Sequence, residues 1–178
     1  MTRAQQQIIE SFRIIVDTRE QRTRRSEQRY KAMGAEIERG VLDYGDYSYN
    51  LTLPTGPLHD IRERIKPAVV IERKQNLDEL AMCFTRSRDR FQREFERAAA
   101  ARARVYLLTE NASFDMILDG QYRSRFQPRA FIASILSWSA KYNMVPVFCD
   151  MNTSGRLIRE ILYRDAQERL EGGSFGKA

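Results

Sequence analysis

Short apolar runs alternate with longer helical patterns along the whole chain. Runs rich in β-branched and aromatic residues, bounded by polar or glycine-containing turns, predict buried strands. Residues 47–53 alternate aromatic, polar and aliphatic side chains, which is typical of a half-buried strand. The last run contains Pro146, which donates no backbone hydrogen bond, so its strand is expected toward a sheet edge. The predicted strands cover residues 12–16, 35–41, 47–53, 67–71, 105–109 and 145–149.

Capping residues and apolar spacing predict the helices between these strands. Gly34 ends the first of them, and Asn76 caps a long helix that runs through Arg97. Pro128 occupies the first turn of another helix, where its missing N–H costs nothing. The predicted helices cover residues 24–33, 76–97, 113–118, 128–142 and 153–170.

Strands that alternate with helices predict the α/β class, with a central mixed sheet flanked by helices. We find neither an internal repeat nor a linker, so residues 1–178 are interpreted as one domain with a core of about 12–170. The ends, 1–11 and 171–178, are expected to be flexible, with 1–11 either frayed or helical. The charged stretch 58–66 is expected to be a mobile loop or one helical turn. No apolar signal core or membrane-length run occurs, which predicts a soluble, intracellular protein.

The net charge of +6 and a pI near 9.5 favour an acidic partner, with nucleic acid first. Arginine supplies 25 of the 30 basic residues, and its two-pronged geometry suits phosphate. A GC-rich genome explains the same bias equally well. Cys83 and Cys149 fit small core positions, and His59 is the only histidine. This composition argues against a zinc-activated water or a histidine-based nucleophile.

Four acids stand at strand ends or just beyond them: Asp17, Glu20, Asp46 and Glu72. Such positions in α/β sheets collect functional side chains, because the loops there leave them open to solvent. Each acid alone has an ordinary explanation, since Asp46 after Gly45 suits a turn and Asp17 suits a helix cap. The four acids together, each at or just beyond the end of an apolar strand, indicate a functional site.

Glu72 and Lys74 project from the same face of a strand, while Arg73 points the other way. Carboxylates hold a hard cation such as Mg²⁺ through oxygen, and the lysine orients or helps to deprotonate the attacking water. An acid followed about 26 residues later by Glu-x-Lys fits the broad PD-(D/E)xK nuclease pattern. These residues alone leave a metal-dependent nuclease and a catalytically silent binding domain at even odds.

Arginines recur at helical spacing after this strand, at Arg86, Arg90, Arg93 and Arg97. They form a basic stripe roughly opposite the apolar face of the predicted helix. A solvated helix face explains Arg86, Arg93 and Arg97 slightly better than a DNA contact does, and Glu94 dilutes the stripe.

Three stretches together resemble the nuclease domain of the XPF-type structure-specific endonucleases. They are Asp17-Thr18-Arg19-Glu20, Leu42-Asp43-Tyr44-Gly45-Asp46-Tyr47 and the run from Val70 to Leu80. That family's signature is Gly-Asp, a variable gap, Glu-Arg-Lys and an aspartate four residues after the lysine, here Asp78. Arg90-Phe91 and the run from Val105 to Glu110 extend the likeness, which covers roughly residues 12 to 165.

The resemblance implies a restriction-endonuclease-like fold and a bound divalent metal, Mg²⁺ with Mn²⁺ as a substitute. Asp17, Asp46 and Glu72 would hold the metal, with Glu20 close by, and Lys74 would position or activate water.

Supporting roles are implied for the neighbouring residues. Arg73 would serve structure or substrate contact, and Asp78 would hold Lys74 or Arg73 in place through a salt bridge. Arg90 would contact a phosphate or brace the site, with Arg86 and Arg93 as further candidate DNA contacts. Where the family has glycine before the helix arginine and glutamine four residues after it, this chain has Asp89 and Glu94.

The sequence therefore predicts a metal-dependent DNA endonuclease that prefers branched, flap or fork DNA. A catalytically silent nuclease-like subunit that binds DNA or scaffolds a partner is the alternative, and a nuclease acting on RNA is a third hypothesis. Members of the family work as dimers, so a homodimer or heterodimer is expected, with an interface from residues 128–149 and the last helices.

Overall fold

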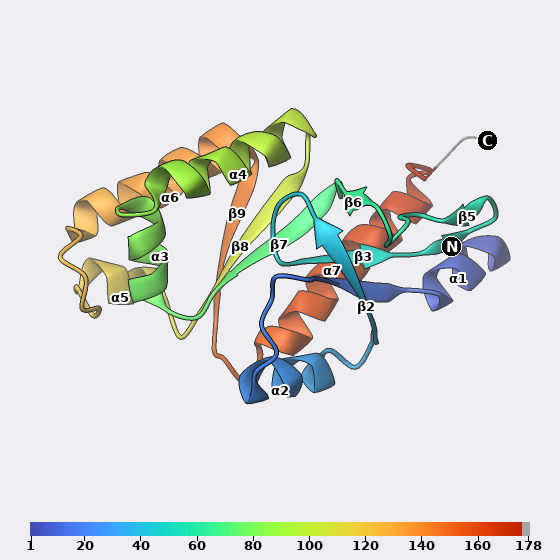
Figure 1. Cartoon of the computed structure of the whole chain (residues 1–178), viewed down its shortest axis with the longest axis horizontal. Helices are drawn as coiled ribbons and strands as arrows, with labels where there is room; N and C mark the ends of the chain where they lie inside the picture. The colour runs from blue at the N-terminus through green and yellow to red at the C-terminus, as the bar shows by residue number, and fades with distance from the viewer. Residues whose placement is uncertain (176–178) are drawn as a thin grey trace.

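Seven strands form one mixed sheet, and helices cover both of its faces (Figure 1). The computed structural model describes residues 1–175. Within that range the helices are α1 (Arg3–Glu10), α2 (Arg24–Met33), α3 (Leu77–Phe84), α4 (Arg88–Ala100), α5 (Phe114–Leu118), α6 (Pro128–Tyr142) and α7 (Ser154–Glu171). The strands are β1 (Arg13–Asp17), β2 (Glu36–Leu42), β3 (Tyr47–Asn50), β4 (Thr52–Leu53), β5 (Gly56–Pro57), β6 (Arg64–Ile65), β7 (Val69–Lys74), β8 (Arg104–Glu110) and β9 (Met144–Cys149).

The strand directions decide which strand ends meet. The order in the sheet is β6-β2-β1-β3-β7-β8-β9, while β4 and β5 form a separate hairpin. β3 is antiparallel to both β1 and β7, and the other neighbours in the sheet are parallel. The carboxyl ends of β1, β7 and β8 therefore share one edge with the beginning of β3. The predicted α/β class with a mixed sheet between helices is confirmed.

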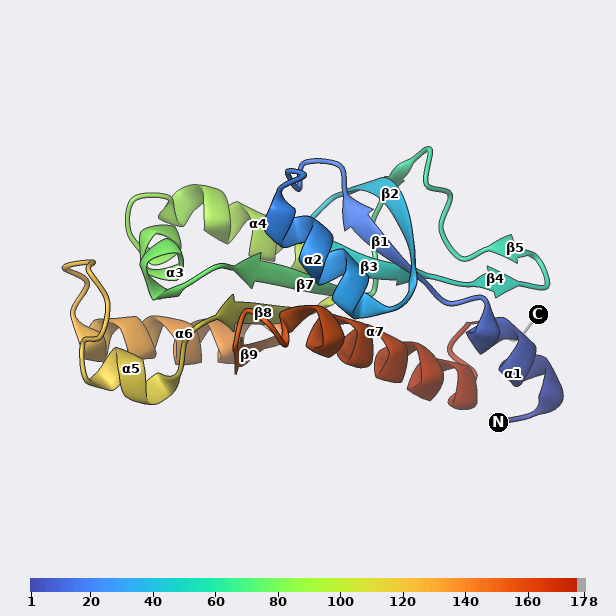
Figure 2. The same cartoon turned by 90° about the horizontal axis from the view of Figure 1, so that it is seen from below.

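Each face of the sheet has its own apolar core. On one face the sheet packs against α3, α4 and α6, through side chains that include Leu80, Phe91 and Phe131. On the other it packs against α1, α2 and α7, through side chains that include Ile9, Met33 and Leu162. Figure 2 shows α7 along one side of the strands and α4 on the opposite side. Within residues 1–175 no helix combines the length and the hydropathy needed to cross a bilayer.

Helices with clear capping signals begin and end where the sequence predicts. Gly34 closes α2 in the left-handed conformation, with φ +58°. The Ser113 hydroxyl accepts a hydrogen bond from the backbone of Met116 (3.0 Å) at the start of α5, and Pro128 opens α6. The edge position predicted for the strand with Pro146 is also confirmed.

The predicted long helix from Asn76 is wrong, because the chain forms two helices, α3 and α4. The Thr85 hydroxyl donates to the carbonyl of Ala81 (2.8 Å), and the backbone N–H of Ser87 donates to Met82 (3.0 Å). Hydroxyl side chains that bond to nearby backbone compete with the regular helical pattern. The break turns the second helix away from the first.

The half-buried strand predicted over 47–53 differs from the structure. Tyr47–Asn50 is buried on both faces, because β3 is the middle strand of the sheet. The chain then leaves the sheet, and Thr52–Leu53 pairs with Gly56–Pro57 in the small hairpin.

The stretch 58–66 contains no helical turn. Arg64–Ile65 pairs with the end of β2 at the sheet edge, and the backbone of His59 donates to the Asn50 side chain (2.9 Å). Residues 3–10 form a helix, the second of the two predicted alternatives, and Ile9 in it is buried. The sequence predicts a flexible C-terminal end over residues 171–178. α7 extends one residue into it, to Glu171, and residues 176–178 lie outside the described range.

Gly45, in the turn before β3, cannot be replaced without strain. Its φ is +72°, and an added Cβ would lie 2.1 Å from Cγ2 of Val70. We expect Gly45→Ala to destabilise the protein by about 3 kcal/mol, from left-handed strain and overpacking together. Gly34→Ala is the matched control, since φ is +58° there and nothing lies within 4 Å of the added Cβ. Urea unfolding should show a loss of only about 1 kcal/mol for the control; equal losses would contradict the steric explanation.

Candidate active site

Asp46 and Glu72 meet at the shared edge of the sheet. Tyr47 pairs with Ile71 across β3 and β7, which places the preceding Asp46 beside Glu72. The Asp46 carboxylate accepts a hydrogen bond from the backbone of Arg73 (2.8 Å), and the Asp46 backbone N–H donates to Ile71 (2.8 Å). Backbone contacts on both sides therefore fix the position of this acid.

Glu72 and Lys74 face the same side of β7, as the strand pattern predicts. The ammonium Nζ of Lys74 lies 2.5 Å from Oε1 of Glu72, and their residues are only 8% and 5% exposed. The same ammonium lies 5.2 Å from the ring centroid of Phe91, a favourable cation–π distance. The pair is thus held in an apolar surrounding by α4.

Burial and mutual repulsion perturb the ionisation of this cluster. Burial and the nearby Glu72 raise the pKa of Asp46 to about 8. Burial also raises the pKa of Glu72. Burial alone would lower the pKa of Lys74, but Glu72 and Asp46 outweigh it and raise that pKa above its ordinary value. Lys74 is therefore held as a cation, and one cation faces two carboxylates.

Asp17 lies at the same edge, but its carboxylate is already engaged. It accepts hydrogen bonds from the backbone and side chain of Arg19 (both 2.7 Å) and from the backbone of Leu42 (2.8 Å). Its backbone N–H donates to the carbonyl of Asp46 (2.9 Å). These contacts tie β1, β2 and the Asp46 turn together.

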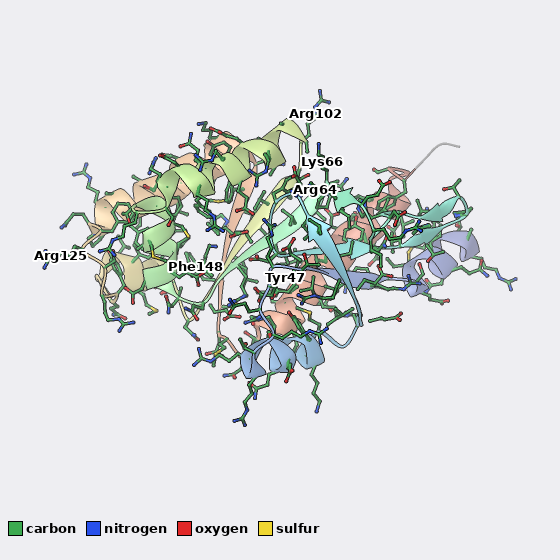
Figure 3. All side chains as sticks on the ribbon, viewed as in Figure 1. Tyr47, Arg64, Lys66, Arg102, Arg125 and Phe148 are labelled. Carbon is green, nitrogen blue, oxygen red and sulfur yellow. The ribbon has the colours of Figure 1, made fainter. Side chains whose placement is uncertain are left out.

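Glu20 lies with the side chains of the opposite face. Its carboxylate accepts from the Tyr47 hydroxyl (2.8 Å) and from Arg29 (3.3 Å). Arg29 and Arg73 each also form an ion pair of 3.1 Å with the buried Glu110. Figure 3 labels Tyr47 near the middle of the fold. The structure thus brings Glu20 and Arg73 into a buried polar network, whereas Asp46, Glu72 and Lys74 gather on the other face.

The sequence analysis gave no role to Arg29 or Tyr47 and quoted Glu110 only as the acid ending a strand. One signal for Arg29 was present, because Ser26, Arg29 and Met33 recur at helical spacing on the buried face of α2. An arginine at a core position requires a buried acid as its partner.

Asp78 pairs with neither Lys74 nor Arg73, so the predicted salt bridge is wrong. Its carboxylate accepts from the backbone N–H groups of Arg123 (2.8 Å) and Ser124 (3.0 Å), far along the sequence. α3 begins with Asn76 as its cap and directs the Asp78 side chain to that loop instead of back to the strand.

The predicted DNA-contacting arginines Arg86, Arg90 and Arg93 are all exposed to solvent. Glu94 on the same helix points to the site instead, where it accepts from the backbone of Gly45 (2.8 Å). Its charge contributes to the raised pKa of Glu72, after burial.

Two carboxylates are the part of the predicted metal set that the structure brings together. Within residues 1–175, no group of three or more histidine, cysteine, aspartate or glutamate side chains is arranged to hold a metal ion. Mg²⁺ needs fewer, because one or two carboxylates plus water and substrate phosphate complete its shell. Asp46 and Glu72 each keep one carboxylate oxygen without a hydrogen bond to the described residues. This donor chemistry fits Mg²⁺.

A cleft of about 530 Å³ lies on the other face of β7, beside Glu20, Arg29, Arg73 and Glu110, and Asp46, Glu72 and Lys74 are not among its lining residues. Arginines from the first turn of α2 and the loop before it, Arg19, Arg24 and Arg25, also line it. Its volume and its arginines suit the entry of an anionic polymer chain.

Acids and a lysine at one edge of a mixed sheet between helices define a restriction-endonuclease-like nuclease domain. A sequence model described as the ERCC4 domain matches residues 16–160. The chain therefore belongs to the ERCC4 domain family, the XPF-type nucleases. No curated protein is a significant match by sequence.

Two solved structures share the fold. XPF from Aeropyrum pernix matches with a TM-score of 0.57 and 19% identity, covering 86% of this chain and 61% of that chain. XPF from Aeropyrum pernix in complex with DNA matches with a TM-score of 0.59 and 20% identity, covering 88% and 65%. The chain thus spans less than two thirds of the proteins it matches. At this identity the likeness establishes the fold alone.

The raised pKa of Asp46 predicts how stability depends on pH when a chelator is present. The folded value of about 8 lies above the ordinary 3.8, so folding favours the protonated acid. The contribution of Asp46 protonation to the free energy of unfolding is complete below pH 3.8, falls as the pH rises, and is lost above about 8. Asp46→Asn should therefore gain stability relative to the parent between pH 5 and pH 8.5.

Urea unfolding in EDTA at several pH values checks this expectation. Asp89→Asn, an exposed change of the same chemistry on α4, is the control and should track the parent. A difference between Asp46→Asn and the parent that does not vary with pH would contradict the raised pKa of Asp46.

Proposed function

We propose that this chain is a metal-dependent DNA endonuclease that hydrolyses phosphodiester bonds. The observation that carries the proposal is the cluster of Asp46, Glu72 and Lys74, in which two acids with raised pKa share one cation and each keeps an available carboxylate oxygen. Such a cluster is costly to bury, and a bound cation would relieve the cost.

Asp46 and Glu72 are the proposed ligands of Mg²⁺, with Mn²⁺ as a substitute. When bound, the ion would supply Lewis-acid polarisation of the phosphate and lower the pKa of a water molecule. The hydrogen bond from the backbone of Arg73 keeps the Asp46 carboxylate in one orientation. Asp17 and Glu20 act indirectly in this proposal, Asp17 by fastening the Asp46 turn and Glu20 by balancing Arg73.

Lys74 acts as a positively charged donor in this proposal, because its raised pKa opposes a role as general base. Its remaining N–H groups would orient the attacking water or stabilise charge that develops on the phosphate oxygens. Glu72 holds the ammonium in place, and Phe91 covers it.

DNA is the proposed substrate. The arginines that line the cleft suit the phosphate backbone, and one of the solved structures of the same fold is in complex with DNA. Selectivity for branched, flap or fork DNA is part of the proposal and follows from the XPF-type family. RNA is the competing substrate that a cleavage assay would include.

A catalytically silent DNA-binding or scaffold subunit is the second candidate function. Retention of Asp46 beside the buried pair of Glu72 and Lys74 favours the enzyme, because a scaffold gains nothing from it. Calorimetric titration with Mg²⁺ separates the two, since binding that Glu72→Ala abolishes is expected only for the enzyme.

Asp46→Ala and Glu72→Ala should each abolish Mg²⁺- or Mn²⁺-dependent cleavage while the fold persists. Loss of several kcal/mol of charge stabilisation corresponds to a fall in rate of about a thousandfold. The assay uses labelled duplex, single strand, 3′ flap, 5′ flap, fork and four-way junction, with an RNA strand beside them. Asp89→Asn serves as the active control. Unchanged cleavage by both alanine variants would overturn the proposal.

We further propose that two copies of this chain associate through α5, α6 and β9. Leu118, Leu136 and Val145 on these adjoining elements are exposed by 60%, 53% and 37%, and an apolar surface that they share would mark an interaction site. Leu136→Glu should give a monomer in light scattering where the parent is a dimer. Ile61→Glu changes a residue with 40% exposure on another surface and should leave the dimer intact. A parent monomer at micromolar concentration would contradict this part of the proposal.

A further inference from the structure

A second hollow, of about 900 Å³, lies between α3 and the loop 121–127. We call it the outer groove. Arg86, Arg123 and Arg125 line it, and Met82 and Phe126 give it apolar walls. Figure 3 shows Arg125 projecting from this end of the molecule. Its lining shares no residue with the 530 Å³ cleft.

Asp78 holds the loop of the outer groove in a fixed shape. Its carboxylate accepts from the backbones of Arg123 (2.8 Å) and Ser124 (3.0 Å) and from the Arg123 side chain (3.3 Å). Within the loop, the Tyr122 hydroxyl donates to the carbonyl of Phe126 (2.7 Å). Arg123 and Arg125 are therefore presented by an organised loop, which lowers the entropy lost on binding.

The charge of the outer groove is not balanced by the protein. Arg86 and Arg125 are exposed, and neither has an ion pair or side-chain hydrogen bond with the residues described. Asp78, the one acid among the lining residues, is already bonded to the loop. Met82 beside them is 46% exposed. Unpaired guanidinium groups around an apolar strip suit a phosphate backbone with its sugars and bases.

The outer groove is also tied to the active site through the chain. Lys74 ends β7, and Asp78 follows four residues later in the first turn of α3. Four residues span at most about 14 Å. Duplex DNA rises about 3.4 Å per nucleotide along its axis. Asp78, at the margin of the outer groove, is therefore at most about four nucleotide rises from Lys74, so a strand with its scissile phosphate at the acids can extend to the groove within a few nucleotides.

We propose that the outer groove binds the DNA backbone a few nucleotides from the cleaved bond. This inference rests on the proposed function, because it assigns part of the DNA substrate to a second surface. It explains why Asp78 faces the loop and not the catalytic lysine.

Binding is measured by fluorescence anisotropy in the Glu72→Ala background, so that no DNA is cut. Arg86→Ala/Arg125→Ala removes two charges without breaking a described contact, and should raise Kd and lower the salt slope of log K by about 2. Lys66→Ala/Arg104→Ala removes the same charge elsewhere and should leave the slope near that of the parent. Asp78→Ala keeps all three arginines but releases the loop that carries Arg123 and Arg125, and should weaken binding as well.

A shortened substrate sharpens the test. In this substrate the duplex arm directed toward the outer groove ends about two nucleotides from the mapped cleavage position. The Arg86→Ala/Arg125→Ala variant and the Lys66→Ala/Arg104→Ala control should then bind it equally. If the parent binds and cuts DNA but the outer-groove variant matches the control on the long arm, this inference is overturned and the nuclease stands. If the parent neither binds nor cuts DNA, the proposed function and this inference fail together.

Discussion

β7 ends in three consecutive charged side chains, Glu72, Arg73 and Lys74, and the surrounding structure must supply partners for their charges. Alternation along the strand sends Glu72 and Lys74 to one face of the sheet and Arg73 to the other. A buried charge without a partner costs several kcal/mol, so each face must supply counter-charges. On one side Asp46 adds a second acid beside Lys74, and Phe91 of α4 covers the ammonium. On the other side Glu20 and Glu110 pair with Arg73.

The two faces of β7 differ in their balance of charge. This difference suits the α2 face to a structural role and the other face to the proposed catalytic role. On the α2 face two arginines oppose two glutamates, and a tyrosine hydroxyl completes the network. That set is neutral, and its four charged side chains line the 530 Å³ cleft. On the other face Lys74 alone opposes Asp46 and Glu72, so the two acids cannot both ionise there without uncompensated negative charge, and the pKa of Asp46 rises to about 8. Only this second face gains from a cation.

Local signals predicted most of the fold, and long-range pairing explains what they missed. Gly34, Ser113 and Pro128 act on their own helix ends, so a short window contains the whole cause. The same holds for Glu72 and Lys74, whose shared face follows from strand alternation. The ion pair of Arg29 with Glu110 joins residues 81 positions apart, and Asp78 binds a loop 45 positions away. No local pattern specifies such partners, although an arginine on the apolar face of α2 shows that one must exist.

Glu94 shows how a departure from the family pattern changes the active-site charge. The carboxylate accepts a hydrogen bond from the backbone of Gly45, a bond that an amide oxygen of glutamine would accept equally well. The carboxylate differs by bringing a further negative charge within reach of Glu72, whose pKa it helps to raise after burial. With glutamine there, Lys74 would come closer to balancing the cluster. With glutamate, the turn before Asp46 is held in the same way, but the apo site carries more uncompensated charge, so its stability depends more strongly on protonation or on a bound cation.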